Sequence, residues 1–276
     1  MTAATPGSDP VLRIVVVTYH PGPALTSLLA SLPAATSAPY DVVLADNGGT
    51  PDVPGTTRLA LPTNVGYGRG ANAGAAGFGG DWLLVVNQDV IFESGSIDAL
   101  LDAGPRWPRA DVFGPLIRTS TGEVYPSARQ LPSIGRGLGH AALGWWRPDN
   151  RWTRAYRQED AAAGERTCGW LSGACMLVRR AAFESVRGFD PAYFMFFEDT
   201  DLCRRLGQDG TGCVYVPTAV VHHEEGQARA RHPRWMLREH HKSAFRYLSR
   251  QYPWLAPVLA VGLTARYLLL VALGRT

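Results

Sequence analysis

The stretch that decides the fold is Leu12–Thr18, LRIVVVT, an unbroken apolar run rich in β-branched residues. Such a run predicts a strand that is buried on both faces. Helical spacing of leucines over 24–32 follows it, and two further apolar runs, DVVLA at 41–45 and WLLVV at 82–86, come later. Strands that alternate with helices are typical of an α/β fold, in which helices cover both faces of a mostly parallel sheet.

Polar side chains follow three of these predicted strands: Thr18-Tyr19, Asp46-Asn47 and Asn87-Gln88-Asp89. One polar strand end is ordinary turn chemistry, but three at one edge indicate a site, because ligands bind at the carboxyl ends of parallel strands. A carboxylate such as Asp89 suits Mg²⁺ or Mn²⁺, which take oxygen ligands and bridge phosphates. The structural alternative for Asp89 is a turn cap.

A glycine-rich loop, NVGYGRGAN at Asn64–Asn72, precedes a predicted helix of small residues. Its glycines allow the backbone to approach a bulky anion, the amides of the helix N-terminus attract one, and Arg69 adds a cation. Gly66, Gly68 and Ala71 also fit a dinucleotide-binding fingerprint. That fingerprint normally follows the first strand of its domain, whereas two strand units precede this loop, so dinucleotide binding is the weaker alternative.

Three carboxylates, Glu198, Asp199 and Asp201, begin the predicted helix of FMFFEDTDLCRR, 194–205. Acids in a first turn complement the helix dipole, which is their structural explanation. The aromatic run before them would place Glu198 and Asp199 beside a dry cleft, where a carboxylate can act as a general base. Further on, the run VVHHEE at 220–225 ends a predicted strand in two histidines. Either histidine is structural or a ligand for Mn²⁺.

The length of 276 residues predicts one core with an appendage, and the net charge of +3 is too small to indicate nucleic-acid binding. The four cysteines form no C-x-x-C pair and residues 1–10 read as a flexible leader without signal-peptide character. We therefore expect reduced, structural thiols in a cytoplasmic protein. The aromatic loop at 131–157 is either an acceptor site or a satellite core.

The C-terminal tail, residues 229–276, is expected to be helical. Cations recur at every fourth position from 234 to 250, and an apolar stretch, interrupted by Arg266, follows at 254–273. One interpretation is a solvated face over a core-packed helix. The other is attraction to an anionic membrane surface, with the apolar stretch in the interface and Arg266 arguing against a full span.

In this order, the motifs resemble those of the family 2 inverting glycosyltransferases of GT-A fold, in particular the bacterial rhamnosyltransferases. The resemblance covers 11–250, and its most specific part is GFDPAYFMFFEDTDLCRR at 188–205. It implies a Rossmann-like, mostly parallel mixed sheet flanked by helices over 11–228, followed by a C-terminal helical extension. A nucleotide-binding half (11–110) and an acceptor half (111–228) are implied within it.

The resemblance also implies roles for individual residues. The donor nucleotide is expected to contact Thr18, Tyr19, Asp46, Asn47, Asn64, Gly66, Tyr67, Gly68, Arg69, Asn72, Asn87 and Gln88. The acceptor is expected to contact Trp170, Gly173, Ala174, Glu198 and Asp201. The catalytic base of the family corresponds to Asp199 in this sequence. The Mg²⁺ or Mn²⁺ ion falls on Asp89 and His222, with His223 as an alternative, and this metal motif departs from the family pattern because only its last position is acidic.

The implied reaction moves a sugar from a dTDP- or UDP-sugar, in particular L-rhamnose from dTDP-rhamnose, to a polyprenyl-diphosphate-linked saccharide in cell-wall or polysaccharide assembly. The enzyme would be peripheral on the cytoplasmic face of the membrane, and an oligomer is left open. Two alternatives stand beside it. A nucleotidyltransferase would usually need a second carboxylate next to Asp89, and a non-catalytic sugar- or lipid-binding module would need no base such as Asp199.

Overall fold

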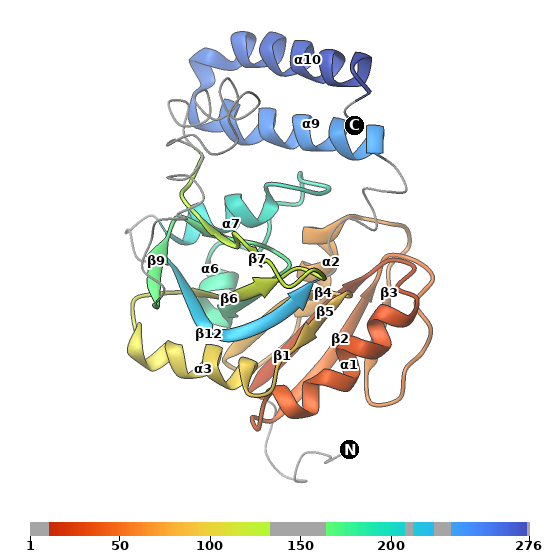
Figure 1. Ribbon diagram of the computed structural model, residues 1–276, viewed down its shortest axis with the longest axis vertical. Coiled ribbons are helices and arrows are strands. Elements are labelled where there is room, and N and C mark those ends of the chain that lie inside the picture. Colours follow the sequence, from red (N-terminus) through yellow and green to blue (C-terminus); the bar gives the residue numbers. More distant parts are fainter. Residues whose placement is uncertain (1–10, 133–163, 208–211, 224–232, 275–276) are drawn as a thin grey trace.

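The computed structural model of the chain describes residues 11–132, 164–207, 212–223 and 233–274. Its centre is a mixed sheet in the order β3-β2-β1-β4-β11-β6-β12-β5 (Figure 1). Four parallel strands form one half: β1 (Leu12–Thr18), β2 (Tyr40–Asp46), β3 (Thr57–Ala60) and β4 (Trp82–Asn87). The α/β fold predicted from the sequence is confirmed. The predicted leader and most of the aromatic loop lie outside the described residues.

Strand β11 (Cys175–Arg179) reverses direction between β4 and β6 (Val112–Arg118). Its antiparallel register brings Ala174, just before β11, beside the carboxyl end of β4, where the Asn87 amide donates to the Ala174 carbonyl at 2.9 Å. The long strand β12 (Cys213–His223) pairs parallel to β6 and antiparallel to β5 (Val90–Phe92) and β9 (Arg166–Cys168). β7 (Val124–Tyr125) extends β6 as a hairpin, and β8 (Ala128–Arg129) pairs with β10 (Trp170–Leu171).

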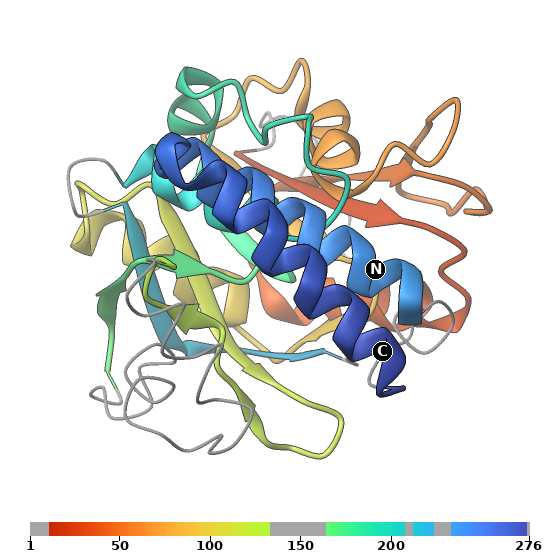
Figure 2. The same ribbon diagram turned by 90° about the horizontal axis from the view of Figure 1, so that it is seen from above.

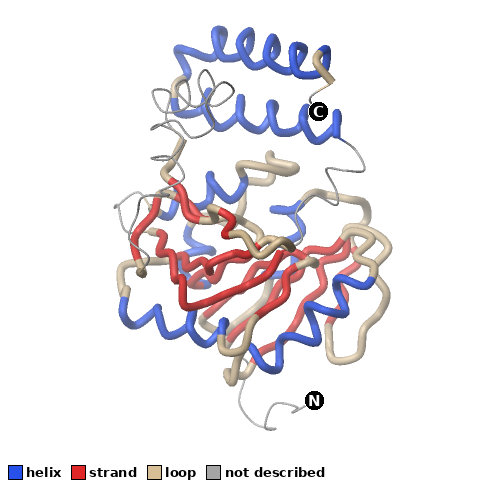
Figure 3. Tube along the Cα trace, viewed as in Figure 1, coloured by secondary structure: helices blue, strands red, loops and turns tan. Residues whose placement is uncertain are grey.

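Helices cover both faces of the sheet (Figures 1 and 3). Alternate side chains of a strand point to opposite faces, so Leu12, Ile14 and Val16 of β1 join one core and Val15 and Val17 the other. The first core is completed by α1 (Pro23–Ala35) and α3 (Ser96–Arg106). The second is completed by α2 (Tyr67–Ala75), α6 (Arg180–Ser185) and α7 (Glu198–Leu206). Three of the four free cysteines are buried in these cores, as expected for structural thiols.

Two C-terminal helices form the layer farthest from the sheet (Figures 1 and 2). Helix α9 (Pro233–Gln251) lies next to the α/β domain, and α10 (Ala256–Ala272) runs back along it after the short 3₁₀ turn η1 (Pro253–Leu255). The predicted helical extension is therefore confirmed. The predicted boundary at 228 falls in a part of the chain that the structure does not describe, and it stays a prediction.

Candidate active site

The three polar strand ends lie side by side, as predicted. Thr18 is in register with Asp46 on β2, and its neighbour Val17 is in register with Asn87 on β4. Beyond them, Tyr19 and Gln88 exchange hydrogen bonds, with the Tyr19 amide donating to Gln88 Oε1 at 2.7 Å and Gln88 Nε2 donating to the Tyr19 carbonyl at 3.2 Å. The Tyr19 side chain is left exposed at 51%. This edge therefore presents an open aromatic face.

Asp46 and Thr18 support this edge from within the protein. Oδ1 of Asp46 accepts from the Thr50 hydroxyl and the Gly48 amide, both at 2.7 Å, and Oδ2 accepts from Arg58 at 2.9 and 3.0 Å. Burial opposes ionisation, but the bonds from Thr50 and Arg58 outweigh it and hold the pKa of Asp46 below its usual value. Thr18 is fully buried and accepts from the same Thr50 hydroxyl. Asp46 and Thr18 thus have a structural role at this edge, and their predicted nucleotide contacts stay a prediction.

The loop before α2 is also bonded within the protein. The amides of Val65, Gly66 and Tyr67 donate to Asn47 Oδ1, Asn64 Oδ1 and the Phe194 carbonyl, at 2.9, 3.1 and 3.0 Å. An amide that already has a partner cannot bind an anion without losing that partner. The expectation that these amides face a phosphate is therefore wrong for these three groups.

The glycines of α2 serve close packing against the segment that leads to α7. Gly66 has a φ of 91°, and a Cβ there would lie 2.2 Å from the Phe194 carbonyl oxygen. A Cβ on Gly68 would lie 2.8 Å from Cβ of Phe189. Asn72 bonds both the amide and the carbonyl of Phe189, at 2.9 and 2.8 Å. Since these glycines face protein atoms, the dinucleotide interpretation loses its physical basis.

Arg69 also bonds to the segment that leads to α7. Its Nε donates to the carbonyl of Pro191 at 2.6 Å. The basic residue that the sequence offered as an anion ligand therefore joins α2 to the segment ahead of α7. The glycine-rich motif thus positions the segment that carries the catalytic candidates.

Asp199 lies in the first turn of α7 with three internal hydrogen bonds. Oδ1 accepts from the Thr200 amide at 2.6 Å and from the Thr200 hydroxyl at 3.2 Å. Among the described residues, Oδ2 accepts only from the Gly173 amide, at 2.9 Å. Because a carboxylate oxygen has two acceptor positions, Oδ2 keeps one lone pair for a proton from outside the protein.

Glu198 is the buried neighbour of this group, with a relative exposure of 6%, and its Oε2 atom has no hydrogen-bond partner in the part of the chain that the structure describes. Burial, reinforced by the charge of Asp199, raises the pKa of Glu198 to about 8. Burial also raises the pKa of Asp199, although the hydrogen bonds from Gly173 and Thr200 oppose this. Asp199 is therefore the member of the pair that ionises first, because bonds stabilise its charge and none reaches Glu198 Oε2.

Tyr67 belongs to this acidic centre rather than to the nucleotide edge. Its hydroxyl donates to the Gly173 carbonyl, while the Gly173 amide donates to Asp199. Burial and the nearby charge of Glu198 raise the pKa of Tyr67, so its hydroxyl stays protonated and remains a donor. Hydrogen bonds thereby hold both the amide and the carbonyl of Gly173.

A strained segment places Asp199 at the start of α7. Phe196 and Phe197 both adopt left-handed backbone angles, with φ of 67° and 64°. Such a conformation costs on the order of 1–3 kcal/mol per non-glycine residue and persists only where surrounding contacts hold it. Helix α9 supplies those contacts: both phenylalanine rings pack on His240, and the Ser243 hydroxyl donates to the Met195 carbonyl at 2.8 Å.

Asp201 does not face the acceptor side of this centre. Its side chain is only 1% exposed and pairs with Arg204 at 3.2 Å and with Arg205 at 2.7 Å. Arg205 in turn donates to the carbonyls of Val186 and Gly188, both at 2.8 Å. Asp201 therefore holds α7 against the chain before it, and its predicted acceptor contact stays a prediction without support from these bonds.

Arg129 is a site residue that the sequence did not reveal. Its guanidinium lies 5.1 Å from the centres of the Tyr125 and Trp170 rings, and its charge favours the ionised form of Asp199. Trp170 is 8% exposed and donates its indole N–H to the Gln130 carbonyl at 3.1 Å. The predicted acceptor residue Trp170 thus supports Arg129 in the site. A two-residue strand gives no periodic pattern that would have identified Arg129.

The metal candidates are rearranged relative to the prediction. His223 Nε2 lies 3.2 Å from Asp89 Oδ1 and 3.2 Å from Asn87 Nδ2. His222 points away and pairs with Glu93 at 2.9 Å. Adjacent residues of a strand face opposite sides, so only one histidine can join Asp89. Of the two histidines that the sequence left open, His223 is the one beside Asp89, and its role as a metal ligand stays a prediction.

The Asp89–His223 pair fits a divalent ion as two neighbouring ligands. In an octahedral site with bonds of about 2.1 Å, adjacent ligand atoms lie about 3 Å apart. Within the described residues there is no cluster of three or more histidine, cysteine or acidic side chains that could hold a metal ion. Phosphate oxygens and water are suitable as further ligands.

Comparison with known proteins agrees with this geometry. Residues 10–242 match the model of the family described as glycosyltransferase like family 2. The chain is 50% identical over 269 residues to an N-acetylglucosaminyl-diphospho-decaprenol L-rhamnosyltransferase of Mycobacterium tuberculosis, covering 90% of this chain and 88% of that one. It is 43% identical over 86 residues, 30% of this chain and 31% of the other, to rhamnosyltransferase WbbL of Escherichia coli K12.

Two solved structures share the fold at 14% identity. Staphylococcus aureus TarS, residues 1–349, has a TM-score of 0.52 over 83% of this chain and 64% of that one. GalNAc-T7, crystallised with UDP, GalNAc and Mn²⁺, has a TM-score of 0.58 over 79% of this chain and 44% of that one. The sheet, the strand-end site and the matched family together show that this chain is a GT-A-type member of the glycosyltransferase family 2.

Proposed function

We propose that this glycosyltransferase transfers L-rhamnose from dTDP-rhamnose to a hydroxyl of N-acetylglucosamine carried on a polyprenyl diphosphate, with inversion at the anomeric carbon. The name of the M. tuberculosis relative, which is 50% identical over nearly the whole chain, supports the sugar and the acceptor. The observation that carries the chemistry is the free lone pair of Asp199 Oδ2 beside the Gly173 backbone. The nucleotidyltransferase alternative has no support from the family match.

In the proposed reaction, Asp199 Oδ2 accepts the proton of the acceptor hydroxyl. The hydroxyl oxygen then forms a bond to the anomeric carbon while the bond from that carbon to the diphosphate oxygen breaks on the opposite face. A positioned base of this kind contributes roughly 10²–10⁴-fold to the rate. The hydrogen bond from the Gly173 amide fixes Oδ2 and so orients its lone pair. Glu198 is buried and protonated, so it places no second negative charge beside the base.

Asp89 and His223 would hold the divalent cation, Mg²⁺ or Mn²⁺. A bound cation stabilises the negative charge that develops on a departing diphosphate. Asn87 and Gln88 lie next to this pair and keep their predicted role at the donor diphosphate. The exposed Tyr19 face is the proposed stacking surface for the nucleobase, because an aromatic ring can pack on the base without needing a hydrogen bond.

The enzyme is proposed to act as a peripheral protein on the cytoplasmic face of the membrane. Pro253–Ala272 is a helical stretch long and apolar enough to cross a membrane, with a mean hydropathy of 1.9 and 0% of it buried. Arg266 donates to His241 of α9 at 2.9 Å, so its charge turns toward the protein. The outward residues are large and apolar, including Trp254, Val258, Val261 and Leu268. Such a face favours an in-plane position in the interface.

The test is an assay of the purified full chain with dTDP-rhamnose and decaprenyl-diphosphate-N-acetylglucosamine in lipid vesicles, with Mn²⁺ or Mg²⁺. Mass spectrometry of the lipid product should show one added deoxyhexose, with one dTDP released per product, and NMR should show inversion. The same assay with UDP-sugars should give little product. Transfer from UDP-sugars only, or retention at the anomeric carbon, would contradict the proposal.

A further inference from the structure

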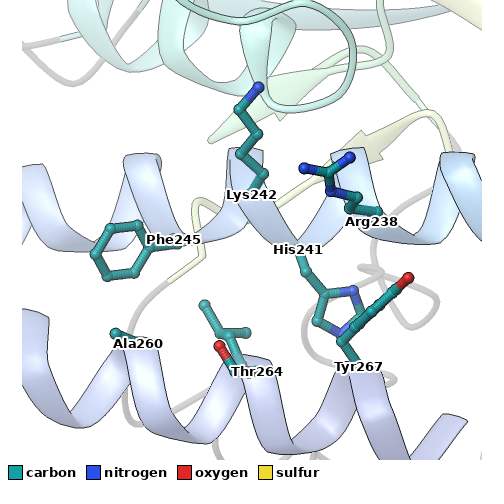
Figure 4. Close-up of a pocket in the computed structure, with 8 residues that line it drawn as sticks. Arg238, His241, Lys242, Phe245, Ala260, Thr264 and Tyr267 are labelled. Atoms are coloured by element: carbon teal, nitrogen blue, oxygen red, sulfur yellow. The ribbon is translucent and has the colours of Figure 1, made fainter. Parts of the chain in front are cut away.

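A groove lies between α9 and α10 (Figure 4). Its volume is about 290 Å³, just below the roughly 300–1,000 Å³ of ligand pockets in general. Its lining is mainly apolar and includes Phe245, Ala260, Leu263 and Tyr267, while Arg238 and Lys242 add two cations. The groove is thus suited to a ligand that joins an apolar chain to an anionic head.

The two cations of the groove differ from the last two cations of the basic stripe on α9. Arg246 and Arg250 both bind the carboxylate of Asp190, so each of them has an ion-pair partner on the α/β domain. Arg238 makes no ion pair among the described residues, and Lys242 is 68% exposed with one long contact to Glu239 at 3.5 Å. Arg238 and Lys242 are four residues apart and so lie on the same side of the helix. Their charged ends extend away from α10 (Figure 4).

The groove also lies between the two surfaces that a lipid-linked acceptor has to connect. On one side is α10, which lies beyond α9 as seen from the sheet (Figure 1) and carries exposed apolar residues. On the other side, the opposite face of α9 supports the strained segment before Asp199, through His240 and Ser243. A chain that enters along α10 would therefore meet the cations of α9 before its sugar reached the base.

We propose that this groove binds the lipid diphosphate of the acceptor, with its first isoprene units against Phe245, Ala260 and Leu263 and its diphosphate at Arg238 and Lys242. The inference rests on the proposed function, because it takes the acceptor to be a polyprenyl diphosphate. Hydrogen bonds between cationic side chains and phosphate oxygens are stronger than neutral ones, whereas the apolar lining selects for the hydrocarbon. Together they favour a lipid diphosphate over a free phosphate.

The first experiment measures acceptor kinetics for Arg238→Gln and Lys242→Gln, each in the full chain with decaprenyl-diphosphate-N-acetylglucosamine in vesicles. Arg234→Gln is the matched control, because Arg234 is an exposed cation of the same helix that does not line the groove. Loss of one charge-assisted contact should raise the acceptor KM by about five- to tenfold. The donor KM, vesicle binding relative to Arg234→Gln, and kcat at saturating acceptor should stay unchanged.

The second experiment fills the apolar part of the groove with Ala260→Phe. Ala265→Phe is its control, since Ala265 is exposed on α10 and does not line the groove. Ala260→Phe should raise the KM for decaprenyl-diphosphate-N-acetylglucosamine. It should leave unchanged the KM for N-acetylglucosamine carried on a short-chain alkyl diphosphate. Ala265→Phe should change neither value.

The outcomes distinguish failure of the groove proposal from failure of the proposed function. If the wild-type chain transfers no sugar to either acceptor, the proposed function fails. If the wild type is active but the groove variants keep the wild-type KM, the groove proposal alone is overturned. An equal rise in KM for Arg234→Gln, with equal loss of vesicle binding, would also overturn it, because the cations would then attract phospholipid headgroups in general.

Discussion

The backbone amide of Gly173 donates a hydrogen bond to Oδ2 of Asp199 at 2.9 Å, which joins the segment before β11 to the first turn of α7. The hydroxyl of Tyr67 reaches the carbonyl of the same glycine from α2. Three elements that are far apart in sequence thereby fix one carboxylate oxygen. Since catalysis by a positioned base depends on its geometry, the Gly173 backbone contributes to the proposed reaction by holding the carboxylate in place.

Gly173→Ala should impair transfer without unfolding the protein. A Cβ at this position would lie 3.3 Å from Cβ and 3.4 Å from Oδ2 of Asp199, closer than most Cβ contacts. The carboxylate would therefore shift by a few tenths of an ångström, and we expect kcat to fall about tenfold or more, as misplacement of reacting groups generally causes. Steady-state kinetics measure this. Gly79→Ala is the control, because no atom lies within 4 Å of a Cβ there, and an equal kcat for both variants would contradict the prediction.

Glu198→Gln should stabilise the protein at alkaline pH. The unfolded carboxyl loses its proton near its ordinary pKa of 4.5, whereas burial raises the pKa of folded Glu198 to about 8. Between these values the folded state binds more protons, so the wild type loses stability as the pH rises. Glutamine removes this dependence. The melting temperature of Glu198→Gln relative to wild type should increase between about pH 5 and about pH 8.

The exposed Glu123→Gln on the β6–β7 hairpin is the control for that experiment. Its melting temperature relative to wild type should not follow the same rise. A constant difference between Glu198→Gln and wild type across the range would show that Glu198 is already ionised in the folded protein.

His223→Ala should weaken metal binding and His222→Ala should not. His223 lies 3.2 Å from Asp89, whereas His222 pairs with Glu93 on the other side of β12. Even outer-shell partners of a metal contribute about 10–100-fold to its affinity, so loss of a ligand should raise the Mn²⁺ concentration for half-maximal activity at least tenfold. Titration of activity and of Mn²⁺ binding in the presence of dTDP measures this. Equal behaviour of the two variants would refute the assignment.

Arg129→Gln should move the pH dependence of transfer. The Arg129 guanidinium lowers the pKa of Asp199 against the larger, raising effect of burial. Without that charge the pKa of the base rises, so the acid limb of the kcat/KM profile should shift to higher pH. Arg129→Lys keeps the charge and should leave the limb in place. A limb that is unmoved in Arg129→Gln would assign Arg129 a packing role between Tyr125 and Trp170 only.

The sequence predicted the features that depend on local patterns of residues. Apolar runs such as Leu12–Thr18 became buried strands, and the polar residues after them met at one edge because parallel strands bring their carboxyl ends together. The aromatic run before Asp199 correctly indicated a carboxylate in a poorly solvated place, since burial raises the pKa of Asp199.

The sequence could not reveal features that depend on long-range contacts. Glycines look alike whether they face a phosphate or the Phe194 carbonyl. Likewise, the choice between His222 and His223 depends on which face of β12 turns to Asp89, and the register with β5 and β6 decides that. The role of Arg129 arises from pairing between β8 and β10, about 40 residues apart in the chain, as the Trp170–Gln130 bond also shows.

The central claim, that Asp199 is the base of an inverting rhamnosyl transfer, is tested most directly by Asp199→Asn. The amide is nearly isosteric but cannot accept the proton of the acceptor hydroxyl. With dTDP-rhamnose and the decaprenyl-diphosphate acceptor, we predict that kcat falls roughly 10²–10⁴-fold while calorimetric binding of dTDP stays unchanged. Transfer by Asp199→Asn at the wild-type rate would contradict the account.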